Sequence, residues 1–214
     1  MINPFNGLSK PEITSLYDLL GVHAYRFKKG QEILPTIKNE NIIGIVMSGY
    51  AEIIHVEYNG NEILAEELTE NSVFGNSISG TNNENCQIVA RDDTEVVVID
   101  YDKLMNPKNS KHDFFIIFYR NIFDIINAKI REQNERIRIL EKKQIRDKLL
   151  EYFELKHRKS RSKNIYLPFT FKTLADYIGV NRSAMFRELK NLKEENFIEI
   201  NDRKITLLYK GGLM

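Results

Sequence analysis

The feature that most constrains the fold is the stretch from Phe114 to Phe153, which contains neither glycine nor proline. Its apolar residues recur every three or four positions, the spacing of one face of an α-helix. The sequence therefore predicts a long helix whose apolar face is too narrow to be buried along its whole length. The apolar positions are Phe115, Phe118, Ile122, Ile126, Ile130, Ile137 and Leu140, and Gln133 interrupts them.

A long helix with a narrow apolar face favours a parallel partner helix, because the pair buries what one chain leaves exposed. We therefore expect a homodimer. The alternative is a helix that lies along its own β domain, and we expect the two arrangements in different turns of the helix. The expected dimer contacts are Ile122, Ile126, Ile130, Gln133 and Ile137.

Before this helix the hydrophobic pattern has the period of β-strands. Short β-branched runs alternate with turn signals, and Asn59-Gly60 between two such runs predicts a hairpin. The spacing predicts an antiparallel β-roll, similar to a jelly roll, preceded by a short helix over Ser9–Leu20. The expected strands are Ala24–Phe27, Glu32–Leu34, Ile42–Met47, Ala51–Val56, Glu62–Leu68, Gln87–Ala90 and Glu95–Ile99.

The C-terminal part has the pattern of a winged helix-turn-helix. Thr170 is expected to cap one helix that ends at Gly179, and Asn181 to cap a second helix over Arg182–Asn196. A hairpin with its turn at Asn201-Asp202 would form the wing. Before this unit we expect a helix over Gln144–Leu155, a basic loop at 157–163 that contacts phosphates together with Lys156, and an edge strand over Ile165–Phe169.

The charge is unevenly distributed along the chain. Residues 139–214 hold 17 Lys and Arg against 10 Asp and Glu, a net charge of +7, while residues 1–138 carry −6. A basic half with a helix-turn-helix pattern indicates binding to double-stranded DNA. The outward face of the second helix predicts the reading residues, because arginine matches the guanine edge. The predicted DNA-binding residues are Arg182, Ser183, Phe186, Arg187, Lys190, Thr170 and Lys172.

Several segments resemble one known family. They are the turns Phe27-Lys28-Lys29-Gly30, Met47-Ser48-Gly49 and Val73-Phe74-Gly75, the strand Val89-Ala90-Arg91, and Val180–Arg187. On these residues the whole chain resembles the Crp/Fnr family of bacterial transcription regulators. The resemblance implies a cyclic-nucleotide-binding-like roll, a dimerisation helix, a winged helix-turn-helix and a palindromic operator. The resemblance also makes RNA polymerase a possible partner, without identifying the residues that would contact it. Ser183 stands where many members carry Glu.

The resemblance also implies an effector pocket, expected at Phe74, Gly75, Asn76, Asn85, Cys86 and Lys129. Cyclic-nucleotide-binding members carry a Glu after Phe-Gly and then an Arg-Ser pair. This chain has Asn76 at the first position and the stretch around Glu84 at the second. A phosphate without a cation is unfavourable, so cAMP is not the expected effector. Another small molecule, no ligand, or a cyclic-nucleotide- or haem-responsive sensor remain the alternatives.

Other chemistries find little support in the sequence. The single cysteine, Cys86, excludes an iron–sulfur cluster and an internal disulfide, and isolated histidines argue weakly for haem. No phosphate loop, nucleophile elbow or paired metal ligands indicate an enzyme or a metal site. No apolar run approaches the length of a membrane span, and we expect a cytoplasmic protein.

The predicted fold class is therefore α+β in three parts. Residues 1–110 are expected to form the β-roll sensor domain and residues 111–140 the dimerisation helix. Residues 141–214 are expected to form the DNA-binding domain.

Overall fold

The computed structural model describes residues 3–33, 41–58, 60–75, 85–167 and 170–209 of the chain. The chain forms two compact units, residues 1–128 and 129–214. The long helix α4 (Asp113–Leu140) contributes residues to both. Among the described residues, no helix combines the length and apolar character needed to cross a membrane.

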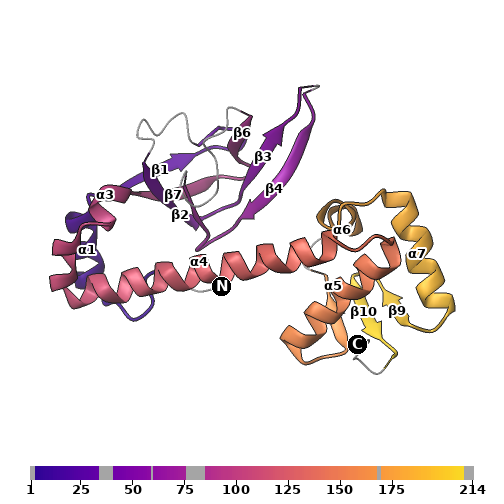
Figure 1. Cartoon of the computed structure of the whole chain (residues 1–214). Helices are drawn as coiled ribbons and strands as arrows, with labels where there is room; N and C mark the ends of the chain where they lie inside the picture. The colour runs from indigo at the N-terminus through magenta and orange to yellow at the C-terminus, as the bar shows by residue number, and fades with distance from the viewer. Residues whose placement is uncertain (1–2, 34–40, 59, 76–84, 168–169, 210–214) are drawn as a thin grey trace. The chain divides into compact units, whose positions relative to one another are not determined.

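The first unit contains two antiparallel sheets (Figure 1). One has the strand order β1-β7-β2-β5 and the other β4-β3-β6. The elements of this unit before α4 are α1 (Lys10–Leu20), β1 (His23–Phe27), β2 (Ile42–Ser48), β3 (Ala51–Val56), β4 (Glu62–Leu68), β5 (Val73–Phe74), β6 (Cys86–Ala90), β7 (Thr94–Asp100), α3 (Tyr101–Leu104) and a 3₁₀ helix (Pro107–Lys111).

Alternation along β2 builds two cores on opposite faces of the first sheet. Ile42 and Val46 join the second sheet in one core, while Ile43 and Ile45 join α1 and α4 in the other. The predicted hairpin is confirmed, since Gly60 has φ +81° and β3 pairs with β4 on either side of it. Its Asn59 lies outside the described residues.

The strand predicted at Glu32–Leu34 is wrong over the described part. Glu32 lies in an isolated bridge to Val89 and not in a strand, and Leu34 lies outside the described residues. The short strand β5 and helix α3 were not predicted. Both are shorter than the several residues over which a hydrophobic period can be recognised in a sequence.

Two apolar stripes run along α4, one residue apart. The inner stripe of Phe115, Phe118, Ile122 and Ile125 is at most 9% exposed and packs into the first unit. The outer stripe is solvent-facing, with Phe123, Ile130 and Ile137 between 51% and 57% exposed. We call this outer stripe the α4 seam; it comprises Ile116, Tyr119, Phe123, Ile126, Ile130, Gln133, Ile137 and Leu140.

This division corrects one predicted dimer contact. Ile122 is 3% exposed and belongs to the core of its own unit, so it is not available to a second chain. Ile126 is half-buried against the same core, whereas Ile130, Gln133 and Ile137 are exposed. The predicted series combined the inner and outer stripes because both are apolar at helical spacing.

The second unit has the predicted helix-turn-helix and wing around one core. Its strand order is β8-β10-β9, with β8 at the expected edge. Together with the β-rich first unit and the long helix, these elements confirm the predicted α+β fold class. After α4 the elements are α5 (Ile145–Ser160), β8 (Asn164–Tyr166), α6 (Phe171–Tyr177), α7 (Arg182–Glu194), β9 (Ile198–Asn201) and β10 (Lys204–Leu207).

Several boundaries in this unit differ from the prediction, and two of them move predicted features. Helix α5 continues to Ser160, so most of the expected basic loop is helical. The wing turn lies at Asp202-Arg203, because Asn201 pairs with Lys204 and Asp202 takes the left-handed conformation with φ +51°.

Candidate DNA-binding surface

Helix α7 has one buried face and one exposed face. Met185, Leu189 and Leu192 are at most 2% exposed and anchor the helix in the core of the second unit. The residues predicted to read DNA share the opposite face, because they are spaced four apart. Arg182, Ser183, Phe186, Arg187 and Lys190 are all exposed.

Capping residues fix where the two helices begin. The Thr170 hydroxyl accepts from the Thr173 N–H at 3.2 Å, and the Asn181 side chain accepts from the Ala184 N–H at 3.2 Å. Both predicted caps are therefore confirmed. Between the helices Gly179 has φ +63°, a conformation that side chains disfavour. A Cβ at this position would also lie 3.0 Å from Leu140 Cδ2.

Some side chains on the exposed face of α7 contact other residues of the second unit. The Phe186 ring packs against Phe171 with centroids 5.6 Å apart, and the Arg182 guanidinium lies 5.6 Å from the Phe186 ring centre. Lys190 lies 3.6 Å from Glu194 in an exposed ion pair, which contributes little energy. Arg187 forms no ion pair with any residue that the structure describes, so its guanidinium can accept an external partner.

The flanking cations are only partly available. Thr170 and Lys172 are exposed, as predicted for phosphate contacts. In the expected basic loop, however, Lys159 lies 2.6 Å from Glu135 on α4. Lys156 lies over the Tyr152 ring, where burial and the charge of Lys159 lower its pKa. These contacts engage both lysines within the second unit, and their predicted phosphate role stays a prediction.

Sequence reasoning missed Arg146, which links α5 to the end of α7. Its guanidinium binds Glu195 through both terminal nitrogens, lies 3.4 Å from Glu188, and stacks over the Phe197 ring. The hydrogen bonds between Arg146 and Glu195 raise the pKa of the guanidinium and lower that of the carboxyl. No local signal marks these contacts, because the partners lie far apart in sequence.

A second missed contact supports the turn. Lys148 Nζ donates to the carbonyl of Ile178 at 3.1 Å and lies 3.5 Å from that of Gly179. These carbonyls follow the C-terminal end of α6, where a cation is favourable. A basic residue on α5 gives no sequence signal for this role.

Two of the predicted effector residues, Phe74 and Cys86, belong to one buried core of the first unit. Phe74 and Gly75 are buried, and the Phe74 ring leaves no room for a Cβ on Gly44. Cys86 is 8% exposed, and burial raises the pKa of its thiol. Asn85 is exposed, Lys129 is half-buried on α4 in the second unit, and Asn76 lies outside the described residues.

The cation nearest in sequence to this region is engaged elsewhere. The Arg91 guanidinium lies 2.7 Å from Glu52 and 2.5 Å from Glu62, on strands β3 and β4. Hydrogen bonding to Glu52 is the main cause that raises its pKa. A phosphate at Arg91 would therefore compete with two carboxylates for this cation.

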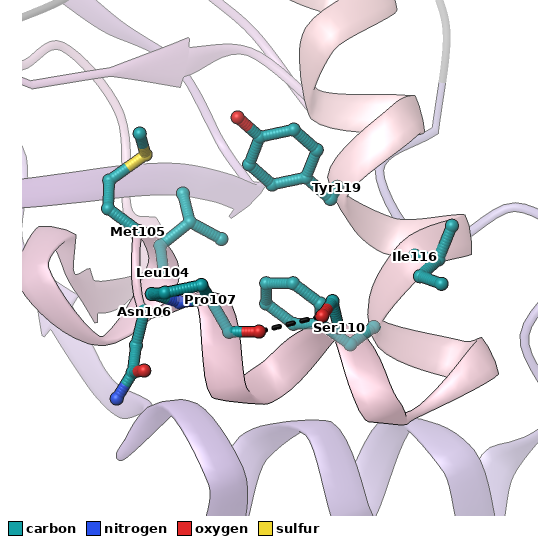
Figure 2. A pocket seen from close by; sticks show the side chains of 8 residues that line it. Leu104, Met105, Asn106, Pro107, Ser110, Ile116 and Tyr119 are labelled. Carbon is teal, nitrogen blue, oxygen red and sulfur yellow. Dashed lines mark hydrogen bonds between the residues drawn. The ribbon is translucent and has the colours of Figure 1, made fainter.

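A pocket of about 240 Å³ lies in the first unit, between the α3 region and the start of α4 (Figure 2). Ile116 and Tyr119 of the α4 seam line one side, and Leu104, Met105 and Pro107 line the other. The Ser110 hydroxyl donates to the Pro107 carbonyl at 2.7 Å, so this polar group is satisfied internally. The pocket therefore lies beside the first residues of the α4 seam, and most of the side chains that line it are apolar.

Comparisons with known proteins agree with this architecture. Residues 25–107 match the family model described as a cyclic nucleotide-binding domain, and residues 143–214 match that of a Crp-like helix-turn-helix domain. The putative HTH-type transcriptional regulator ycf28 of Porphyra purpurea is 25% identical over 168 residues, covering 76% of this chain and 69% of that protein.

Two solved structures share the fold. CprK complexed with OCPA, as a variant, gives a TM-score of 0.70 at 19% identity and covers 91% of this chain and 89% of its own. A CooA variant from Carboxydothermus hydrogenoformans gives 0.64 at 18% identity, covering 90% and 86%. The two family models together match more than half of the residues, in the order sensor-like domain and then helix-turn-helix, and the chain belongs to the Crp/Fnr family of DNA-binding transcription regulators.

Proposed function

We propose that the protein is a homodimeric, sequence-specific transcription regulator that reads a palindromic DNA operator. The outer face of α7 carries this proposal: Arg182 and Arg187 are exposed while the opposite face of the same helix is anchored in the core. The major groove is wide enough to admit such a helix.

The side chains on this face suit different parts of the duplex. Arg182 and Arg187 would bind guanine O6 and N7 in a bidentate manner. The Phe186 ring would hold the Arg182 guanidinium in position by the contact between them. Ser183 and Lys190 would assist at bases or phosphates. Thr170 and Lys172, beside the start of α6, would fix the register through phosphate contacts.

The α4 seam supports the dimer. Its residues are separated by alternating steps of three and four, the spacing of the a and d positions of a coiled coil. Isoleucine occupies three of its four a positions, Ile116, Ile130 and Ile137, and leucine occupies the last d position, Leu140. Ile at a with Leu at d is the combination typical of a parallel two-stranded pair. Among the dimer contacts we infer, Phe123 takes the place of Ile122.

A symmetric pair would read two half-sites. Helix-turn-helix dimers place their reading helices about 34 Å apart, one turn of DNA, so that each enters a major groove on the same side of the duplex. The operator would accordingly be palindromic, and both copies would bind it through equivalent residues.

Selection from random duplex DNA tests this function. We expect one palindromic motif to be enriched, with an affinity that falls steeply as salt rises, because phosphate contacts release counterions. A pool without a shared motif after repeated selection would contradict sequence-specific reading.

We infer that cAMP is not the effector. Arg91 is held by two carboxylates, which supports the sequence argument. CprK is described in a complex with OCPA, so an effector of other chemistry is compatible with this fold. The match to a cyclic nucleotide-binding domain favours the alternative of a cyclic-nucleotide sensor, with a haem sensor as a further alternative. Titration calorimetry with cAMP tests the inference, and we expect no heat of binding.

A further inference from the structure

One polar residue interrupts the otherwise apolar or aromatic α4 seam. Gln133 occupies a d position, one step of three after Ile130 and one step of four before Ile137. These neighbours are 52% and 51% exposed, and Gln133 itself is exposed. A helix pair that buries the two isoleucines must also bury the amide between them.

Two parallel, in-register helices can satisfy the amide. In a parallel, in-register pair each d residue faces the same d residue, so Gln133 meets Gln133 of the partner subunit. A primary amide has both donors and an acceptor. One side chain can therefore donate to the other across the axis.

The competing arrangements leave the amide without a partner. A slip by one heptad places Gln133 opposite Ile126 or Leu140, the neighbouring d residues. An antiparallel pair places it opposite an a residue, and every a position of the seam is Ile or Phe. Burying an amide against hydrocarbon without a hydrogen bond is unfavourable.

We infer that Gln133 sets the orientation and register of the α4 pair, at some cost in dimer stability. This inference rests on the proposed homodimer. It deepens that proposal because only the parallel, in-register pair brings both helix-turn-helix units to the same end of the pair, as reading a palindrome requires.

The test replaces Gln133 by leucine in the full chain and measures two properties. We expect Gln133→Leu to tighten the dimer roughly tenfold in sedimentation experiments. A spin label at Lys143→Cys, near the end of α4, reports orientation, since Lys143 is exposed and Cys86 is buried. The unaltered seam should give one short label-to-label distance. Gln133→Leu should add a population near the helix length, about 42 Å.

The controls separate this inference from the dimer itself. Arg131→Leu adds an apolar side chain on an exposed position off the seam and should change neither property. Ile130→Glu should abolish the dimer, and a dimer that survives it contradicts the seam. If Ile130→Glu dissociates the dimer while Gln133→Leu keeps one short distance, the dimer stands and the role of Gln133 is overturned.

Discussion

At the scale of single residues, Arg187 is the sharpest test of DNA reading. Its guanidinium is exposed and free of ion pairs among the described residues. We expect Arg187→Ala to weaken binding to the selected operator by roughly 1–3 kcal/mol and to flatten the preference at one base pair. Competition binding against single-base operator variants measures both effects.

The matched control for Arg187→Ala is Arg131→Ala, which removes the same charge from α4. This variant should lose little affinity and keep its sequence preference. Equal losses in the two variants would mean that Arg187 contributes only net charge.

The Arg146–Glu195 contact predicts a pH effect on stability. Hydrogen bonding to Arg146 lowers the pKa of Glu195 in the folded chain. Its stabilisation is therefore complete above the ordinary carboxyl pKa of about 4.3 and is lost as the pH falls through the lowered value. Glu195→Gln should melt at lower temperature than the parent near pH 7, and this difference should shrink in acid. A difference independent of pH would contradict the ion pair.

Residue-scale prediction from sequence succeeded where local spacing decides the outcome. Leu174, Met185 and Leu189 were predicted to face inward and are at most 2% exposed, because helical period alone fixes the face. Arg146 and Lys148 could not be assigned. Their partners are carboxylates on α7 and directly after it and backbone carbonyls after α6. Which groups meet depends on how the chain folds back, and the sequence offers many other partners.

At the scale of elements, the α6–α7 turn depends on Gly179. With φ +63°, any side chain there is strained by about 1–2 kcal/mol, and an alanine methyl would also press on Leu140. We expect Gly179→Ala to lower the free energy of unfolding of the second unit by at least that amount. Denaturant titration measures it. Gly60→Ala is the control for strain alone, since a methyl group there would meet no atom of the described residues within 4 Å.

The helix α4 shows why an element can be predicted correctly and its faces misassigned. The absence of glycine and proline predicted the helix, and Asp113–Leu140 is helical. Two apolar stripes one residue apart share the same period, so hydrophobicity alone could not separate the core residue Ile122 from the seam residue Phe123. Only the sheet that packs on one side of the helix separates them.

At the scale of the whole molecule, the uneven charge has a consequence for the proposed regulator. The half that carries α7 is basic and the other half is acidic. Phosphates therefore attract the DNA-binding half and repel the sensor half, which favours binding through the helix-turn-helix. The near-neutral total conceals this polarity.

The symmetric dimer predicts a strict dependence on operator spacing. Inserting five base pairs between the half-sites rotates one by about half a turn of DNA, so two linked reading helices cannot enter both grooves. We expect the affinity of the intact protein to fall to that of a single half-site. Ile130→Glu, which disrupts the seam, should bind both spacings equally and more weakly. If the intact protein tolerates the insertion, its two DNA-binding units act independently, and the reading of a palindrome by one rigid pair is wrong.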